Sequence, residues 1–128
     1  MSTNCECTTT PKLVFSCCGA ADVGDLADRV ARQLNREGTA KMYCLTGIGA
    51  GIQNIIDYSK TASSILAIDG CPVDCTKKLL EKAGINDFAF LRITDLGYTK
   101  GKTDITDEIV SAVTCQASNL IKENVHAK

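Results

Sequence analysis

The sequence lacks an apolar run long enough to cross a membrane, and it lacks a secretory leader. Its first eleven residues hold neither a cationic nor an apolar segment. No later apolar stretch approaches the roughly 20 residues that a membrane span requires. These absences argue against a membrane partner and predict a cytoplasmic protein.

An excess of charge of one sign is also lacking. The 128 residues include 14 Lys and Arg against 15 Asp and Glu, a formal net charge of −1, and no basic block. Because nucleic-acid binding depends on a basic surface, nucleic acid is not an expected partner. Histidine is scarce as well, since His126 is the single histidine and stands near the end of the sequence, where chains fray. A histidine-based catalytic constellation is therefore not expected.

Cysteine, by contrast, occurs eight times. A chain of this length can bury a sufficient core without disulfide bonds, so the cysteines are not needed to hold the fold together. The cytoplasm keeps thiols reduced, and cysteine-rich chains in such a compartment use their thiols for metal binding or thiol chemistry. Function is therefore to be sought among the cysteines.

The sequence predicts a flexible polar tail over residues 1–11, which carries Cys5 and Cys7, and one domain over residues 12–128. Within the domain, short apolar runs alternate four times with segments of helical periodicity. The expected strands are residues 12–17, 41–45, 64–68 and 88–93. The expected helices run from an N-cap at Asp22 to a stop at Gly38, over residues 52–59, from Cys71-Pro72 to Gly84, and from Asp104 onward. Residues 46–51 are too rich in glycine for anything but a loop.

This alternation is typical of parallel sheets whose crossover connections are helices. The expected fold class is α/β: a small three-layer domain in which an open parallel sheet of about four strands carries helices on both faces, of the Rossmann or flavodoxin type. Such folds bind their ligands at the carboxyl ends of the strands, near the point where the strand order reverses.

Five cysteines fall where the predicted strands end. Cys17 and Cys18 close the first strand, Cys44 lies at the end of the second, and Cys71 and Cys75 follow the third. Because neighbouring strands lie about 5 Å apart, these thiols can converge on one site at the carboxyl edge. The alternative is that Cys17 and Cys44 are ordinary buried core cysteines.

The segment from Asp69 to Cys75 is the most informative. Cys71 is expected at or beside a helix N-cap and Cys75 in the first turn, where free N–H groups and the helix dipole favour a thiolate. Two thiolates so placed suit either a metal ion or redox chemistry, and the spacing alone does not decide between them. For Asp69 and Asp74, turn formation and helix capping are sufficient roles, and Asp95 is a candidate partner of a metal ligand.

Three motifs carry a resemblance: Phe15-Ser-Cys17-x-Gly19-Ala20, Met42-x-Cys44-Leu45-x-Gly47-Ile48-Gly49, and Ala67-Ile-Asp-Gly-Cys-Pro72-x-x-Cys75. Together they resemble the DGC-domain family, which is named for a central Asp-Gly-Cys. The resemblance runs from about Lys12 to the Thr94–Gly97 stretch and implies zinc binding without an established biochemical activity. Carried over by position, it implies four metal ligands, Cys17, Cys44, Cys71 and Cys75.

The sequence departs from the family pattern at Cys18, where a serine is usual. Cys18 is interpreted as a small turn residue, with replacement of Cys17 as a ligand and a resolving thiol as alternatives. Cys5 and Cys7 are interpreted as incidental thiols of the tail, and Cys115 as a bystander on the polar side of the last helix. Four thiolates suit Zn²⁺, and they also suit iron, an iron–sulfur cluster or Cu(I).

Two glycine-containing segments imitate nucleotide-binding motifs without the required spacing. In residues 47–51 the third glycine comes too early for a dinucleotide fingerprint, and residues 97–103 have one residue too few for a P-loop. We interpret the first as a loop whose backbone approaches the cysteine site. Lys100 and Lys102, in the second, are either solvated or hold a small anion or acidic partner.

Three hypotheses follow. The first is a non-catalytic zinc-binding protein that serves metal binding, trafficking or sensing, with the metal ion as its partner and no protein partner identified. The second is a thiol-based redox or persulfide-transfer enzyme in which Cys71 or Cys75 is the attacking thiolate. The third is a partner-binding module whose loops a metal stiffens, favoured if residues 47–52 and 98–102 are exposed.

Overall fold

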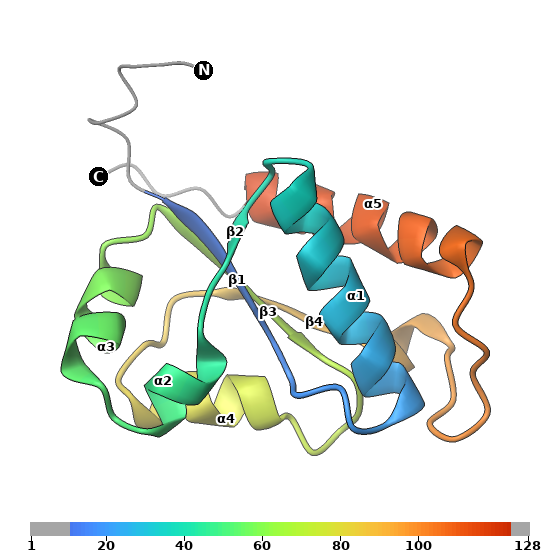
Figure 1. Ribbon diagram of the computed structural model, residues 1–128, viewed down its shortest axis with the longest axis horizontal. Helices are drawn as coiled ribbons and strands as arrows, with labels where there is room; N and C mark the ends of the chain where they lie inside the picture. Colours follow the sequence, from blue (N-terminus) through green and yellow to red (C-terminus); the bar gives the residue numbers. More distant parts are fainter. Residues whose placement is uncertain (1–10, 124–128) are drawn as a thin grey trace.

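The computed structural model describes residues 11–123, and the predictions for Cys5, Cys7 and His126 lie outside this range. Four parallel strands form one sheet in the order β2-β1-β3-β4 (Figure 1). The strands are β1 (Lys12–Ser16), β2 (Lys41–Met42), β3 (Ser64–Asp69) and β4 (Ala89–Arg92). No helix within residues 11–123 is both long enough and apolar enough to span a membrane.

Helices cover both faces of the sheet. One apolar core lies beneath α1 (Asp22–Arg36) and α5 (Asp107–Glu123). The other lies beneath α2 (Leu45–Gly49), α3 (Gln53–Lys60) and α4 (Cys75–Lys82). Side chains of β1 point alternately into the two cores, since Val14 belongs to the first core and Leu13 and Phe15 to the second. The predicted three-layer α/β fold of the flavodoxin type is confirmed.

The chain leaves the central strands in opposite directions. β1 leads into α1 on one face, whereas β3 leads into α4 on the other (Figure 1). In open parallel sheets, this divergence opens a crevice at the carboxyl ends of the two strands. The crevice here lies between the segment after Ser16 and the segment after Asp69.

Residues 45–49 form a short helix, so the prediction of a glycine loop over residues 46–51 is wrong, as is the extension of the second strand to Leu45. The helix is favoured by a side-chain cap at its N-terminus, which the glycine content of residues 46–51 gives no reason to expect. Cys44 is the N-cap, and its Sγ accepts a hydrogen bond from the Gly47 N–H at 3.2 Å.

Helix α4 begins at Cys75, three residues after Pro72, which was the predicted first position of the helix. Pro72 stands instead in a turn that is closed by a hydrogen bond from the Asp74 N–H to the Cys71 carbonyl, at 3.2 Å. Proline favours the second position of such a turn as much as the first position of a helix, so its presence alone did not identify the element. Cys75 lies in the first turn, as predicted, but Cys71 is not the N-cap.

Two further helix starts differ from the predictions. Asp22 is the first residue of α1 rather than its N-cap, which is Ala21. Helix α5 begins at Asp107 instead of Asp104 because Thr106 Oγ1 accepts the Ile109 N–H at 3.2 Å and starts the helix there. The predicted stop of α1 is confirmed, since Gly38 has a φ of +77°.

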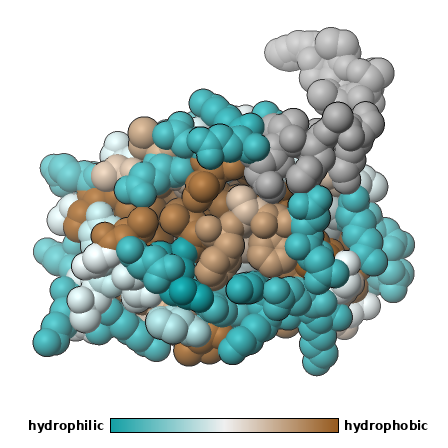
Figure 2. Space-filling view, turned by 180° about the vertical axis from the view of Figure 1, so that it is seen from behind, coloured by the Kyte–Doolittle hydropathy of each residue, from teal (hydrophilic) through white to brown (hydrophobic). Residues whose placement is uncertain are grey.

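Two large apolar side chains are about half exposed: Ile52, which precedes α3, and Val73, in the turn before α4. Seen from behind, apolar residues also form a band across the middle of the molecule, bordered by hydrophilic side chains (Figure 2). Most of the other large apolar side chains lie in the two cores.

Candidate functional site

Four thiols line one pocket in the crevice between β1 and β3. The pocket has a volume of about 150 Å³ and is lined by Cys17, Cys18, Cys71 and Cys75 together with Lys100 and other residues of both crevice segments. Cys17 and Cys71 are partly buried, and Cys18 and Cys75 are exposed at its rim. The structure therefore brings together four of the five thiols expected at this edge.

Glycine makes the close approach of the two segments possible. A Cβ atom at Gly70 would lie 2.6 Å from the Gly24 nitrogen and 2.7 Å from the Val23 carbonyl carbon. A Cβ atom at Gly24 would lie 3.1 Å from Gly19 Cα and 3.4 Å from Cys17 Sγ. Because the obstacles at Gly70 are backbone atoms, no side chain can move aside for a larger residue. Glycine at position 70 thus lets the turn with Cys71 lie directly against the start of α1.

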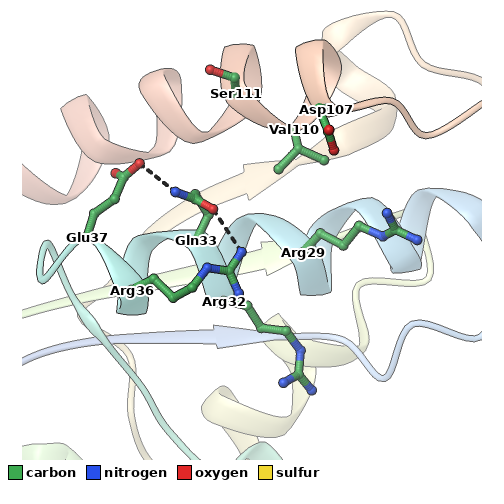
Figure 3. A pocket seen from close by; sticks show the side chains of 8 residues that line it. All are labelled: Arg29, Arg32, Gln33, Arg36, Glu37, Asp107, Val110 and Ser111. Carbon is green, nitrogen blue, oxygen red and sulfur yellow. Dashed lines mark hydrogen bonds between the residues drawn. The ribbon is translucent and has the colours of Figure 1, made fainter.

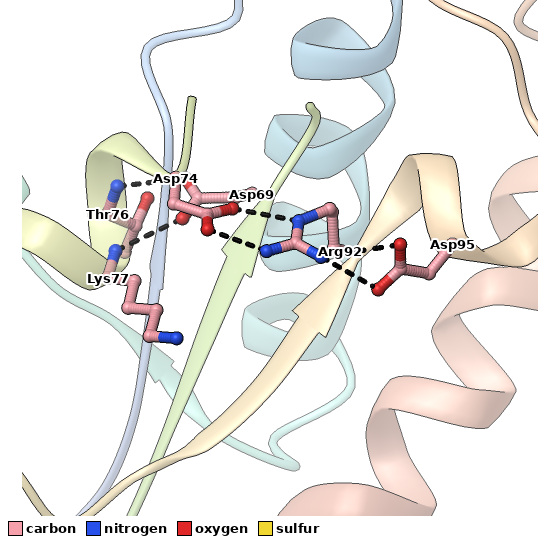
Figure 4. Close-up of polar contacts among 6 residues, drawn as sticks. All are labelled: Asp69, Asp74, Thr76, Lys77, Arg92 and Asp95. Atoms are coloured by element: carbon pink, nitrogen blue, oxygen red, sulfur yellow. Dashed lines mark hydrogen bonds and ion pairs between the residues drawn. The ribbon is translucent and has the colours of Figure 1, made fainter. Parts of the chain in front are cut away.

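Asp69 anchors the second segment. Its side chain is 1% exposed, and its two carboxylate oxygens accept the Thr76 and Lys77 N–H groups at 2.8 and 3.0 Å (Figure 4). These N–H groups belong to the first turn of α4 and have no partner within the helix. The side chain of the N-cap residue, Asp74, makes no capping hydrogen bond to them. The predicted capping role of Asp69 is confirmed, and its consequence is a fixed position for Cys75 at the start of the helix.

A second carboxylate holds the turn between Cys71 and Cys75. Asp74 accepts two hydrogen bonds from Arg92 on β4, at 2.8 and 2.6 Å, and Arg92 also contacts Asp95 at 3.1 Å (Figure 4). The hydrogen bonds from Arg92 and its charge hold the pKa of Asp74 below its ordinary value. Asp74 therefore ties the thiol-bearing turn to the neighbouring strand.

Two opposing influences act on Cys17. Burial raises the pKa of this thiol above its ordinary value, whereas the backbone N–H groups of Gly70 and Gly19 lower it and the negative charge of Asp69 raises it further. A thiolate at this position is accordingly favoured by a positive ligand, which offsets the cost of burying its charge.

Lys100 contacts Cys71, the second partly buried thiol of the pocket. Lys100 Nζ lies 3.6 Å from Cys71 Sγ. The loop that carries Lys100 is tied to α1 by Asp22, whose carboxylate oxygens accept the Gly101 and Thr103 N–H groups at 2.8 and 2.9 Å. These two hydrogen bonds are the largest cause of a pKa of Asp22 below its ordinary value.

Cys44 does not line the pocket, although it follows β2 at the same edge of the sheet. Its side chain is exposed and caps α2, and Gly49 of α2 faces the Leu79 side chain of α4. The alternative that Cys17 and Cys44 are buried core cysteines is wrong for Cys44, and Cys17 is partly rather than fully buried.

The donor set of the pocket consists of soft sulfur ligands, which suits zinc and other thiophilic ions. Within residues 11–123, however, no three His, Cys, Asp or Glu side chains lie close enough together to hold a metal ion as they stand. A cysteine side chain turns about its Cα–Cβ bond between staggered positions, so each Sγ can occupy more than one place around the pocket. The ligand set Cys17, Cys44, Cys71 and Cys75 stays a prediction.

A larger groove, of about 440 Å³, lies between α1 and α5 (Figure 3). Three arginines of α1 line it, but carboxylates on the same helix pair with two of them, Arg29 with Asp25 and Arg32 with Asp28. Arg36 donates to Gln33, which in turn donates to Glu37. The groove contains no thiol and its charges are largely balanced locally, so the thiol pocket is the better candidate site.

Two residues that shape the pocket were not predicted as such: Arg92, which lay inside an expected strand, and Asp22, which was expected to cap a helix. Cys18 was expected at this edge and lines the pocket, although it was interpreted as a small turn residue. Arg92 and Asp22 act on segments far away in the sequence, so no local pattern marks them. For Cys115, exposure on α5 away from the pocket agrees with the role of a bystander.

Comparisons with known proteins agree with the resemblance seen in the sequence. The model of the DGC domain matches residues 13–117. A relative from Pseudomonas aeruginosa, named anaerobic and virulence modulator AnvM, is 32% identical over 88 residues, which make up 69% of this chain and 67% of the relative. No solved structure is significantly similar to the chain.

Proposed function

The chain belongs to the DGC-domain family, and from this premise we propose that it is a zinc-binding protein whose metal is held at the carboxyl edge of the sheet. The proposed ligands are Cys17, Cys71 and Cys75 from the pocket, with Cys44 as the fourth. The observation that carries the proposal is that three of these four thiols, which come from two segments remote from each other in sequence, line one small pocket.

The proposed ligands sit in settings that suit bound thiolates. Cys44 Sγ already accepts an N–H hydrogen bond, and Cys17 has two N–H groups beside it. Such donors stabilise a charged sulfur. The bound zinc would supply the positive charge that a partly buried group of thiolates lacks. Cys18 lines the same pocket and is the natural substitute should Cys44 remain on α2.

Four thiolate ligands fill the coordination sphere of zinc and leave no position for a reactive water. We therefore propose a role in metal binding, trafficking or sensing rather than hydrolysis. The name of the P. aeruginosa relative, a modulator, supports a sensing role. A cytoplasmic location is part of the proposal, because the site requires reduced thiols and the described cysteines are free.

Metal content tests the proposal directly. Protein purified anaerobically under reducing conditions is analysed for metals by elemental mass spectrometry, together with a count of alkylatable thiols. We expect about one zinc per chain in the natural protein and a large loss in Cys17→Ser, Cys71→Ser and Cys75→Ser. Cys115→Ser is the matched control, since it removes an exposed thiol outside the pocket. Unchanged zinc in the Cys71→Ser/Cys75→Ser double variant contradicts the proposed site.

Separate variants decide the fourth ligand. Loss of zinc in Cys44→Ser with retention in Cys18→Ser supports Cys44, and the reverse result assigns the position to Cys18. Retention of zinc in both single variants means either that Cys18 and Cys44 replace each other or that three thiols suffice. The Cys18→Ser/Cys44→Ser double variant distinguishes the two, since it keeps its zinc only if three thiols suffice. That outcome leaves one coordination position open and would reopen the question of catalysis.

A thiol-based redox function is the second candidate, and the contact of Lys100 with Cys71 favours it. In this scheme the Cys71 thiolate attacks a substrate disulfide and releases one substrate thiolate. Cys75 or Cys17 then attacks the Cys71 sulfur of the mixed disulfide and releases the second substrate thiol. The protein is left with a disulfide between Cys71 and the attacking cysteine, and the substrate has gained both electrons. A metal-free protein in which Cys71 is alkylated much faster than the other thiols supports this candidate, and uniform slow alkylation excludes it.

A further inference from the structure

We propose that Lys100 is the counter-cation of the metal-loaded pocket and that it slows the release of the metal. This inference rests on the proposed zinc site. It assigns a role to a loop, residues 97–103, that carries none of the proposed ligands.

The contact that supports the inference joins Lys100 Nζ to Cys71 Sγ at 3.6 Å, and Lys100 is itself part of the pocket lining. Across residues 11–123, the ion pairs found do not include Lys100. Its charge is therefore directed at a sulfur rather than neutralised by a carboxylate.

Charge balance supplies the physical reason. Four thiolates around one Zn²⁺ leave a net charge of −2, and the buried carboxylate of Asp69 lies close enough to Cys17 to act on it electrostatically. Negative charge that is partly removed from water is costly unless a cation lies nearby. Lys100 is a side chain of the pocket lining that carries a positive charge and contacts a proposed ligand.

The position of Lys100 is built into the fold. Gly97 and Gly101 bracket the segment with φ values of +98° and +86°, which glycine adopts without strain. Within the loop, the Thr103 hydroxyl donates a hydrogen bond to the Thr99 carbonyl at 2.7 Å. Asp22 then fastens the loop to α1 through the Gly101 and Thr103 N–H groups. The loop thus holds Lys100 over the pocket through contacts remote from the thiols.

The experiment follows zinc loss from the loaded full-length protein into the chelating dye 4-(2-pyridylazo)resorcinol. We expect Lys100→Gln to release zinc roughly tenfold faster than the natural protein at unchanged initial stoichiometry, the effect typical of removing a partner of a metal ligand. Lys100→Arg keeps the charge and should restore slow release. Lys102→Gln is the matched control, because Lys102 is an exposed lysine of the same loop that does not line the pocket.

Asp22→Asn provides a second measurement through the loop. It keeps Lys100 but weakens the two hydrogen bonds that hold the loop, so we expect release faster than in the natural protein and slower than in Lys100→Gln. Equal release rates for Lys100→Gln and the natural protein overturn the inference while leaving the zinc site intact. Absence of zinc from the natural protein overturns both proposals and is seen in the metal analysis before any kinetics.

Discussion

Arg92 binds Asp74 through two parallel hydrogen bonds, from Nε to Oδ1 at 2.8 Å and from Nη2 to Oδ2 at 2.6 Å. Asp74 has a φ of +57°, a value that no other non-glycine residue shares in the part of the chain described. Left-handed backbone is costly for a residue with a side chain and persists where other contacts compensate. The pair with Arg92 supplies such contacts, and it thereby shapes the turn that carries Cys71.

Removal of this pair should loosen the turn. We expect Arg92→Gln to lower the midpoint of thermal unfolding and to reduce zinc occupancy. Asp95→Asn is the matched control and should change either property little, because the Asp95 side chain is 61% exposed. Asp74→Gly separates strain from pairing, since glycine accepts the left-handed conformation but cannot bind Arg92. If Arg92→Gln behaves like the natural protein, the ion pair does not hold the turn. The difference between Asp74→Gly and Arg92→Gln measures the backbone strain at position 74.

The tie between Asp22 and the loop that carries Lys100 predicts a pH dependence. The pKa of Asp22 is lowered, so its contribution to stability is present above the ordinary carboxyl value of about 3.9 and is lost as the pH falls through the lower folded value. Protection of the Gly101 and Thr103 amides from hydrogen exchange, after correction for the intrinsic rate, should therefore hold down to about pH 4 and disappear in stronger acid. In Asp22→Asn this acid transition should be absent. A transition of equal size in that variant would show that another group titrates.

Two glycines near cysteines should respond differently to alanine. Gly70→Ala brings its Cβ against the backbone of Val23 and Gly24, and we expect a loss of about 1–3 kcal/mol in the free energy of unfolding. Gly47→Ala meets the Cδ1 end of the Ile55 side chain, which can rotate away, and alanine favours a helix. Its cost should stay below about 1 kcal/mol. Chemical denaturation of both variants measures the difference, and equal costs would mean that the turn at Gly70 can move away from α1.

Asp69 should be necessary for the start of α4. Asp69→Ala leaves the Thr76 and Lys77 N–H groups without their acceptor, and we expect a loss of about 1–2 kcal/mol in stability. Asp57→Ala is the control, because Asp57 is an exposed residue of α3 that contacts Gln53 of the same helix. Its effect should remain within about 0.5 kcal/mol. Amide exchange in the first turn of α4 locates the loss, and unchanged exchange there would contradict the capping role.

Metal removal should destabilise the natural protein if the zinc site forms. A ligand that binds the folded state alone, present at 100 times its Kd, stabilises that state by about 2.7 kcal/mol. Thermal unfolding with and without a chelator should therefore show a lower midpoint in the natural protein and in Cys115→Ser. In the Cys71→Ser/Cys75→Ser double variant the chelator should have no effect. A chelator effect of the same size in that variant would place the metal elsewhere.

The alternation of apolar runs and amphipathic segments was sufficient to predict four parallel strands with helices on both faces. It was sufficient because strand and helix periods are local properties. The same alternation placed Cys17 at the end of the first strand and Cys71 and Cys75 after the third, and the structure finds these three at one pocket because these two strands are neighbours. Sequence patterns were less successful in predicting turns and helix starts. Pro72 fits a helix start and a turn equally, and the cap that makes a helix of residues 45–49 uses the sulfur of Cys44.

What the tertiary structure alone decided is how distant segments meet. Asp69 and Asp74 fix the start of α4 through contacts up to 18 residues away, and Asp22 holds a loop some 80 residues later in the chain. The placing of Cys44 outside the pocket and the approach of Lys100 to Cys71 depend on the same long-range packing. A sequence pattern describes each segment by its own period and caps. The distances between side chains of different segments arise only when the sheet and its two layers of helices pack together.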